Sequence, residues 1–247
     1  MNCRLLNVLI VLFPLIACDR NPLPVMGSHS VLEVDVKELS GLCLDNDALS
    51  LLACGDKGVV KSISFNGETT DIWTRPSDME GITMDPSTGD IYLAIEGKQE
   101  VHLLAAPAYS SQKLAFAVKE AVDGVYNNSG LEAVEYYKDG ILFVGSQKDA
   151  NLWQYNVDGT MISKVSLSSF ASEIAGLCYD SQSGRLWVTD SKKAMIFVCT
   201  PDGTLIASYD VSYIHNAESI CVDRSHNCVW VASDEDSTKL YRIAFNF

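Results

Sequence analysis

The stretch that decides the fold is Asp78-Met79-Glu80-Gly81-Ile82-Thr83-Met84-Asp85, which is followed by Pro86-Ser87-Thr88-Gly89-Asp90 and the apolar run Ile91–Ile95. Apolar residues one and three positions after Gly81 alternate with a polar one, which is the period-two pattern of a β-strand. The next five residues are turn formers. A second strand that is apolar on both faces predicts a sheet buried on both sides. The stretch therefore predicts a β-hairpin inside a stack of sheets.

This hairpin pattern occurs five times along the chain. Its copies align on one anchor residue each: Gly41, Gly81, Ala133, Gly176 and Ser219. The residues one and three positions after the anchor are apolar in all five copies, whereas the residue between them is mixed. Third and fourth apolar strands follow most copies, with Asn-Gly or Asp-Gly turns typical of hairpins. A repeat of about 40–50 residues with four strands is typical of a β-propeller blade.

The fifth copy lacks its fourth strand because the sequence ends at Phe247. The segment Val31–Val36 has a strand pattern and precedes the first copy. Pairing this segment with the last blade would close the ring and remove two exposed sheet edges. The sequence thus predicts an all-β fold, a five-bladed β-propeller of four-stranded antiparallel blades closed by an N-terminal strand.

The first residues have the pattern of a targeting segment. A positive start at Arg4 precedes the apolar run Leu5–Ala17, which is too short to span a bilayer but suits a signal peptide. The run ends in Leu15-Ile16-Ala17-Cys18, which resembles a bacterial lipobox and predicts lipidation of Cys18. We expect a signal peptide at 1–17, a lipid-anchored tether at 18–30 and the propeller at 31–247. A soluble-secretion signal with a chance cysteine is the alternative.

These features predict a location in the bacterial cell envelope, facing the periplasm or the cell surface. The net charge of −14 and the pI near 4.6 argue against a nucleic-acid partner. An acidic surface fits cation binding or plain solubility. We expect a monomer that contacts the membrane through its lipid only, with a small-molecule or protein ligand on one propeller face.

Six cysteines remain after Cys3 and Cys18 are set aside: Cys43, Cys54, Cys178, Cys199, Cys221 and Cys228. Most lie in apolar strand patterns, where cysteine behaves as a small hydrophobe, so we expect mostly buried thiols. The best candidate for a disulfide is the hairpin pair Cys221 and Cys228. No C-x-x-C and no histidine at zinc spacing occurs, so the local sequence predicts no zinc site.

Carboxylates recur just before the anchors. That position holds Ser40, Glu80, Glu132, Ala175 and Glu218. Equivalent positions of successive blades lie at one height around the axis, so three glutamates should converge at the channel mouth. Like charges so close raise their own pKa values unless a cation joins them. We therefore predict a metal site of Glu80, Glu132 and Glu218; a hydrated acidic lining without metal is the alternative.

Further acidic residues follow the second strands of four copies: Asp56, Glu96, Asp190 and Asp234. They could add ligand oxygens near the same mouth, or they could be solvated strand ends.

The lipobox, the five repeats, Asp78-Met79-Glu80-Gly81-Ile82 and Asn128-Ser129-Gly130-Leu131-Glu132 together resemble the SdiA-regulated (YjiK-like) family. The resemblance covers about Val36 to Phe247. It implies a five-bladed propeller with a calcium ion and no established enzymatic activity. Ala133 and Ser219 stand where the Glu-Gly motif of the family has glycine. This difference concerns the local backbone geometry and leaves the two carboxylates in place.

We therefore expect a non-catalytic envelope lipoprotein that binds Ca2+ near its channel and serves ligand or protein binding. The alternative is a calcium-dependent hydrolase of the gluconolactonase or phytase type. Glu80 and Asp190 could serve two of the roles in such a site, but Ala175 stands where an asparagine would be needed. No G-x-S-x-G elbow, P-loop or dinucleotide motif occurs in a suitable context, and we assign no catalytic residue.

Overall fold

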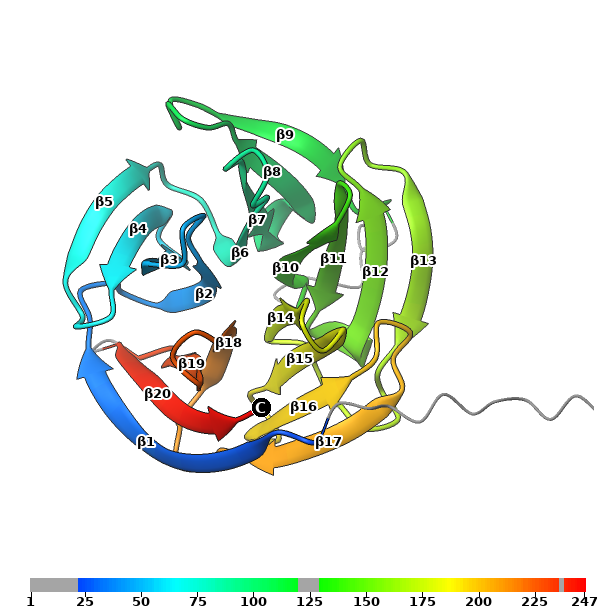
Figure 1. Ribbon diagram of the computed structural model, residues 1–247. Helices are drawn as coiled ribbons and strands as arrows, with labels where there is room; N and C mark the ends of the chain where they lie inside the picture. The colour runs from blue at the N-terminus through cyan, green and yellow to red at the C-terminus, as the bar shows by residue number, and fades with distance from the viewer. Residues whose placement is uncertain (1–21, 120–128, 236–237) are drawn as a thin grey trace, which may run out of the picture.

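The computed structural model describes residues 22–119, 129–235 and 238–247. Within them, five four-stranded antiparallel sheets surround a central axis (Figure 1). The all-β fold predicted from the sequence, a five-bladed β-propeller, is thus confirmed. The predicted signal peptide, Cys18 and residues 120–128 lie outside the described residues.

Each blade runs from the axis to the rim in chain order. The inner strands are β2 (Leu39–Leu44), β6 (Met79–Met84), β10 (Leu131–Lys138), β14 (Gly176–Asp180) and β18 (Ala217–Asp223). The second strands are β3 (Ser50–Gly55), β7 (Ile91–Ile95), β11 (Ile141–Ser146), β15 (Arg185–Asp190) and β19 (Cys228–Ser233). The third strands are β4 (Val59–Ser64), β8 (Glu100–Leu104), β12 (Asn151–Asn156), β16 (Met195–Cys199) and β20 (Lys239–Asn246). The outer strands are β5 (Thr69–Thr74), β9 (Gln112–Ala117), β13 (Met161–Ser166), β17 (Leu205–Asp210) and β1 (Val25–Glu33). Short 3-10 turns η1 (Glu96–Lys98) and η3 (Lys148–Ala150) follow β7 and β11.

The ring is closed by β1, which pairs antiparallel with β20 from Val25 opposite Asn246 to Glu33 opposite Lys239. In Figure 1 the blue β1 lies outside the red β20. The closing strand was expected at Val31–Val36, so it begins and ends earlier than expected. Its first residues are exposed on both faces, so backbone pairing, not a hydrophobic pattern, defines the strand. Val34 and Val36 instead pack into the core between the fifth and first blades.

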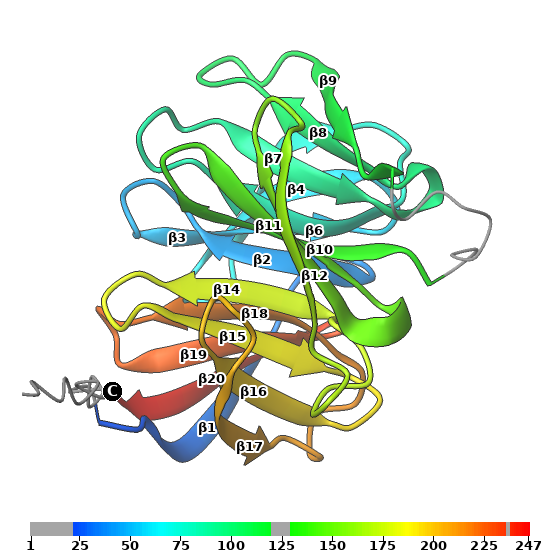
Figure 2. The same cartoon turned by 90° about the vertical axis from the view of Figure 1, so that its right-hand side faces the viewer.

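The hydrophobic cores lie between neighbouring blades, whose sheets stack face to face (Figure 2). The second strands supply two of the largest buried side chains, Trp187 and Trp230, each at most 1% exposed. This arrangement explains why those strands are apolar on both faces. No helix in the described part of the chain is long and apolar enough to cross a membrane.

The cysteines from Cys43 onward are buried free thiols, as expected. Cys221 and Cys228 form no disulfide. Cys221 is paired with Trp230 across the hairpin, while the sulfur of Cys228 lies 3.9 Å from the carboxylate of Asp223.

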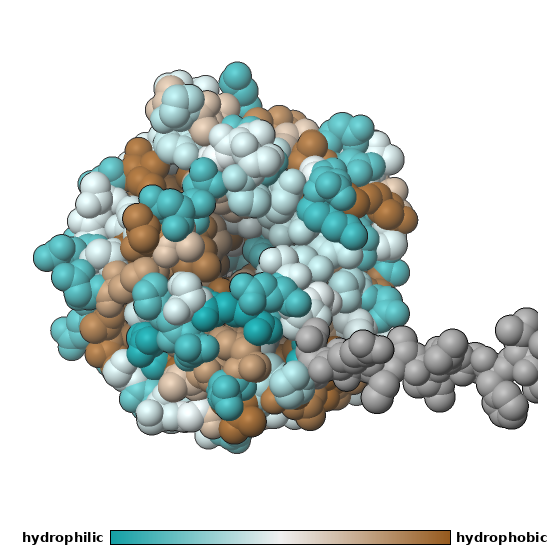
Figure 3. Space-filling model, viewed as in Figure 1, coloured by the Kyte–Doolittle hydropathy of each residue, from teal (hydrophilic) through white to brown (hydrophobic). Residues whose placement is uncertain are grey.

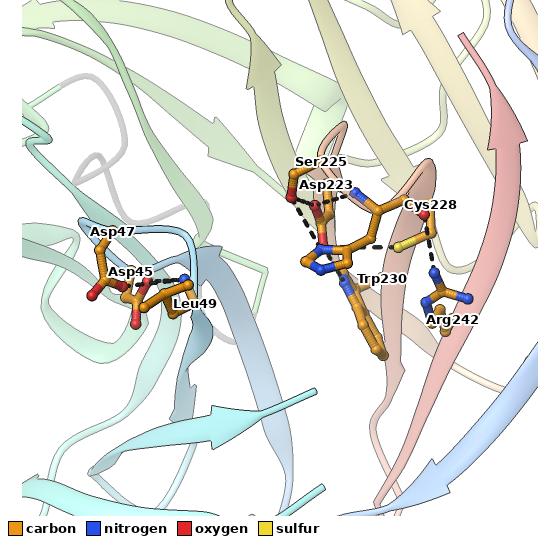
Figure 4. A network of polar contacts seen from close by, with 9 residues as sticks. Asp45, Asp47, Leu49, Asp223, Ser225, Cys228, Trp230 and Arg242 are labelled. Carbon is orange, nitrogen blue, oxygen red and sulfur yellow. Dashed lines mark hydrogen bonds and ion pairs between the residues drawn. The ribbon is translucent and has the colours of Figure 1, made fainter. Parts of the chain in front are cut away.

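An aspartate caps the first hairpin turn in four of the blades: Asp45, Asp85, Asp180 and Asp223. Figure 4 shows two of these caps. Asp223 accepts hydrogen bonds from the Ser225 hydroxyl (2.6 Å), the His226 ring (2.7 Å) and the buried Trp230 indole N–H (3.3 Å). In the more open first blade, Asp45 accepts the backbone N–H of Leu49 at 3.0 Å. The caps fix the turns at the mouth of the channel opposite the anchors.

Replacing Asp223 by alanine should lower the free energy of unfolding by about 2–4 kcal/mol, because it leaves the Trp230 indole N–H buried without an acceptor. Urea unfolding monitored by tryptophan fluorescence measures this change. Asp47→Ala is the matched control, since Asp47 accepts one hydrogen bond in an exposed turn. Equal effects of the two substitutions would show that the buried network adds nothing.

Candidate functional site: an acidic channel mouth

A β-bulge marks the residue before the anchor in four inner strands. The pairing register shifts at Ser40, Glu80, Glu132 and Glu218, each of which is the extra residue between two paired positions. A bulge leaves its extra residue out of the ladder and re-aims its side chain. The repeated carboxylate position is therefore a repeated backbone feature. It persists beside Ala133 and Ser219, so the loss of the anchor glycine does not remove it.

The anchor glycines are required where neighbouring inner strands approach each other. A Cβ atom on Gly81 would lie 2.7 Å from the backbone nitrogen of Val134. A Cβ on Gly41 would lie 2.7 Å from the nitrogen of Ile82, and one on Gly176 would lie 2.8 Å from the carbonyl oxygen of Glu218. Because glycine has no Cβ, the inner strands of adjacent blades can lie this close together at one end of the channel.

The space at this end is small. The hollow at the centre of the ring in Figure 3 is seen from the opposite face, where the chain ends. The cavity between the anchors measures about 10 Å³ and is lined by Ser40, Glu80 and Glu132 among other residues of the inner strands. Such a volume holds roughly one water molecule or small ion.

Three carboxylates form the tightest group at this mouth. Oxygens of Asp56, Asp78 and Glu80 all lie within 4.8 Å of one another, the one such set of acidic, histidine or cysteine ligands in the described residues. Burial and the nearby charges of Asp56, Asp78 and Glu96 raise the pKa of Glu80 to about 8. Burial and a hydrogen bond with Asp56 raise the pKa of Asp78 to about 6. Asp78 and Glu80 therefore keep their protons to a higher pH than exposed carboxylates do.

Glu132 extends the group toward the third blade. Burial, followed by the charges of Glu80, Glu96 and Glu218, raises its pKa to about 10. Its neighbour Glu96 is held in place by the backbone N–H of Gly130, which donates to the Glu96 carboxylate at 3.0 Å. Glu96 therefore links the second and third blades at the mouth.

Glu218 lies on the far side of the same mouth. Burial raises its pKa to about 7, opposed by a hydrogen bond from Ser191 and reinforced by the charges of Glu173 and Asp234. Glu173 is buried, accepts the backbone N–H of Lys192 at 2.8 Å and pairs with the Lys192 ammonium at 2.5 Å. This side of the mouth thus contains a cation, as does the Glu80 side, where the exposed Lys57 ammonium pairs with Asp56 at 3.0 Å.

The predicted metal residues therefore lie around one mouth but not in one tight group. Glu80 and Glu132 line the small cavity, and Glu218 is near enough to raise the pKa of Glu132. A shared ion on all three stays a prediction. The carboxylates closest to Glu80 are Asp56 and Asp78. Asp78 was quoted in the deciding stretch but not assigned a role, because it precedes the strand; the bulge at Glu80 brings the two side chains together.

Asp190, a further candidate from the sequence, has a different role. Its side chain is fully buried and accepts hydrogen bonds from the backbone N–H groups of Ser172 and Lys193 at 2.6 and 2.9 Å, and from the Ser172 hydroxyl. Its oxygens thus hold two loops together. Glu173 is another buried carboxylate at this blade, and the repeat did not predict it because it precedes its strand outside the repeated pattern.

The residues at the Glu80 side fit a hard cation. They offer only oxygen donors, at least three of them already within 4.8 Å of one another, on backbone held by bulges. Burial and neighbouring carboxylates raise the pKa values of Glu80 and Asp78. Asp56 differs, because burial is outweighed by its contact with the Lys57 ammonium at 3.0 Å, which lowers its pKa. Carboxylate oxygens in this arrangement are the ligands that Ca2+ takes.

The same pKa values predict how stability depends on pH. Folded-state values of about 8 for Glu80, 10 for Glu132 and 7 for Glu218 lie above those of exposed glutamates. The folded protein therefore holds protons that the unfolded chain has lost, and the resulting stabilisation is complete below about pH 4.5 and disappears as pH rises through the folded values. Without metal, the free energy of unfolding should fall by about 2–4 kcal/mol between about pH 5 and pH 9. Urea unfolding in chelator measures this; stability that rises over this range would contradict the burial of these acids.

The fold and this mouth define a five-bladed β-propeller with an acidic channel end. The model of the SdiA-regulated family matches residues 159–246, which run from the end of the third blade through the fifth. The match confirms the family resemblance seen in the sequence. No curated protein matches the chain.

Solved structures share the fold at low sequence identity. A glutaminyl cyclase from Myxococcus xanthus superposes with a TM-score of 0.63 at 10% identity, covering 90% of this chain and 96% of its own. A gluconolactonase from Xanthomonas campestris gives 0.59 at 11% identity, covering 88% and 89%. A chain of a nidogen/laminin complex gives 0.60 at 16% identity, covering 87% and 88%. These likenesses concern the fold alone, since propellers carry many functions.

Proposed function

We propose that this protein is a non-catalytic propeller that binds one Ca2+ ion at the acidic channel mouth and presents a face to a ligand or protein. The observation that carries the proposal is the group of Asp56, Asp78 and Glu80, with oxygens within 4.8 Å of one another, in which burial and the neighbouring carboxylates raise the pKa of Glu80 to about 8. Glu96 and Glu132 stand beside it and would supply further oxygens. The bound ion would supply charge compensation and would tie the first three blades together.

Calcium suits this donor set better than a transition metal does. Thiolate and imidazole ligands favour zinc and copper, whereas carboxylates and carbonyls suit calcium. Calcium also accepts irregular geometry and six to eight oxygens, so carboxylates from different blades can share it. Glu218 would stay outside this ion, because its carboxylate is not part of the group whose oxygens lie within 4.8 Å of one another around Glu80.

The hydrolase alternative is less well supported by the contacts of the candidate residues. Asp190, one of its two expected metal ligands, is occupied by the N–H groups of Ser172 and Lys193. Ala175 offers no ligand where an asparagine is needed. His215 is exposed and pairs with Glu235 at 3.4 Å. Metal-activated attack by water needs a complete and open coordination site. The gluconolactonase similarity of the fold keeps this alternative worth a direct test.

Thermal unfolding in calcium and in chelator tests the site. A ligand at about one hundred times its dissociation constant stabilises the folded state by about 2.7 kcal/mol, which for a domain of this size raises the midpoint by about 5–10 °C. No shift would sink the calcium site. A parallel hydrolysis screen of lactones and phosphoesters in calcium tests the non-catalytic assignment; turnover abolished by Glu80→Gln would overturn it.

We also propose that lipid on Cys18 anchors the propeller in the bacterial cell envelope. The support is the sequence Leu15-Ile16-Ala17-Cys18 and the exposed β1, which begins close to this segment at Val25. Cell fractionation of a Cys18→Ser variant tests the anchor. The native protein should sediment with membranes and the variant should be released; membrane association of both would contradict lipidation.

A further inference from the structure

The inner strands lead to a second opening at the channel end opposite the acidic mouth. In β6, Glu80 lines the small cavity at the acidic mouth, whereas Thr83 and Met84 line this second opening. The opening measures about 400 Å³, a volume typical of sites for small organic ligands. Figure 3 looks onto this end of the channel, where the chain ends.

One buried carboxylate stands in the wall of this opening. The position two residues beyond each anchor lines the opening in all five blades, and it holds Cys43, Thr83, Glu135, Cys178 and Cys221. Glu135 is the single charged residue of the five and is only 8% exposed. Burial of a charged carboxylate is costly unless a partner compensates it. The side chain therefore marks the place where a partner of opposite charge would bind.

Hydrogen bonds hold Glu135 in position. The Thr83 hydroxyl donates to one carboxylate oxygen at 3.1 Å, and the backbone N–H of Tyr179 donates to the other at 2.8 Å. The Thr83 hydroxyl in turn accepts the backbone N–H of Tyr136 at 2.9 Å. An ionised carboxylate has about four acceptor sites, more than these donors fill. The carboxylate is thus oriented in advance and can still accept a hydrogen bond from a ligand.

The charges around the opening favour a cation. Among the described residues that line it, the one basic side chain is Lys138, which is exposed and lies over the Tyr137 ring at 4.8 Å. Asp45 and Asp139 add negative charge to the same lining. Burial raises the pKa of Glu135 to about 8, so ionised Glu135 would gain from a positive partner.

Tyrosines form an aromatic wall beside this carboxylate. The pairing register of β10 shifts at Tyr137, and none of the other inner strands shifts register at this end. A bulge re-aims the side chain of its extra residue. The Tyr137 ring meets that of Tyr179 edge to face, with centroids 4.7 Å apart, and both residues line the opening. The Lys138 ammonium over Tyr137 shows that this wall accepts a cation.

We propose that this opening binds a small organic cation, a protonated primary amine whose ammonium group pairs with Glu135 and whose aromatic or alkyl body lies against Tyr137 and Tyr179. An ammonium group has donors for the remaining acceptor sites of the carboxylate, and hydrogen bonds between charged groups are the strong ones. Its charge supplies the compensation that the neutral donors of Glu135 do not. A metal ion suits the opening less, because the lining offers one buried carboxylate and not a converging set of oxygens.

This inference rests on the proposed function in one respect, the ligand-binding role, and gives that ligand a place and a chemical class. It does not depend on the calcium ion. Glu80 and Glu135 line cavities at opposite ends of the channel. We therefore expect calcium and the amine to bind independently.

Titration calorimetry with three matched probes tests the proposal. 2-Phenylethylamine, 2-phenylethanol and phenylacetate have similar bodies and differ chiefly in charge. We expect one amine to bind per chain with a dissociation constant below about 1 mM, and the alcohol to bind at least about tenfold more weakly. Phenylacetate should give no binding. Excess Ca2+ should leave amine binding unchanged, because an amine at the acidic mouth would be displaced.

Substitutions on the native chain separate charge from shape. Glu135→Gln keeps the shape of the side chain and removes its charge, so it should weaken amine binding at least about tenfold and change alcohol binding by less than about twofold. Lys138→Gln removes a like charge from the rim and should strengthen amine binding by about two- to threefold. Asp47→Asn is the matched control, because Asp47 is an exposed carboxylate in a hairpin turn at the same channel end and outside the lining.

No amine binding, equal binding of amine and alcohol, displacement of the amine by Ca2+, or unchanged amine binding in Glu135→Gln would overturn the proposal. A crystal of the native protein soaked with 2-(4-bromophenyl)ethylamine needs no variant and covers the case in which Glu135→Gln does not fold. An anomalous bromine signal in this opening supports the site, whereas a signal only elsewhere contradicts it. If calcium stabilises the protein but the amine does not bind, this inference fails and the calcium site stands.

Discussion

A Glu80→Gln variant is expected to be more stable than the native protein in chelator at about pH 8, and to lose most of its stabilisation by calcium. In the native protein, burial and the charges of Asp56 and Asp78 make ionised Glu80 unfavourable. A neutral amide of the same shape removes this repulsion, so the metal-free protein should gain about 1–3 kcal/mol. The same substitution removes a central carboxylate from the calcium group, so the ion binds weakly.

Urea unfolding with calcium and with chelator measures both effects in one series. Glu68→Gln is the matched control, because Glu68 is exposed in a turn at the other side of its blade and should change neither value. A variant that is less stable in chelator and equally stabilised by calcium would show that Glu80 is an ordinary structural residue. A variant that gains stability in chelator but is stabilised by calcium as much as the native protein would place the ion away from Glu80.

Removal of β1 should have a still larger effect on the fold. A chain that begins at Val34 lacks the whole of Val25–Glu33, which covers the length of β20 by backbone pairing. The fifth blade would then end in an exposed strand that carries Leu240 on one face and Ile243 and Phe245 on the other. Unpaired edges of this kind pair with other chains. We expect the free energy of unfolding to fall by more than about 4 kcal/mol and the truncated chain to self-associate. A loss of this size exceeds what most single substitutions cause.

The control for this truncation is a chain that begins at Pro22, which retains β1. It also keeps the hydrogen bonds from Arg185 and Tyr209 to the carbonyl oxygens of Pro22 and Pro24. Sedimentation and urea unfolding compare the two chains. A monomeric chain from Val34 with unchanged stability would show that the propeller does not need ring closure by its N-terminal strand.

The sequence predicts most of this fold because inner and second strands have two independent signals. Their apolar residues repeat with period two, and the pattern recurs at each anchor, as at Gly81 and Gly176. Outer strands have weaker signals. The first half of β1 is mostly exposed and has no apolar alternation, so its pairing with β20 defines it, and its bounds were set too late in the chain.

The site was predictable only where the repeat itself carries the chemistry. Glu80 and Glu132 were found because their position recurs, and the structure shows the physical basis of the recurrence, a bulge at that position. Asp78 was missed because its proximity to Asp56 depends on that bulge and on the neighbouring hairpin. Asp190 was overvalued because its occupation by two backbone N–H groups depends on loops outside the repeat.

The most direct test of the central claim is equilibrium dialysis with radioactive calcium at about pH 8, where the carboxylates at the mouth titrate. The native protein should bind one Ca2+ per chain, with release of protons from the Glu80 group, and Glu80→Gln should bind much less. Full retention of that calcium by Glu80→Gln, or no binding by the native protein, would contradict the proposed site.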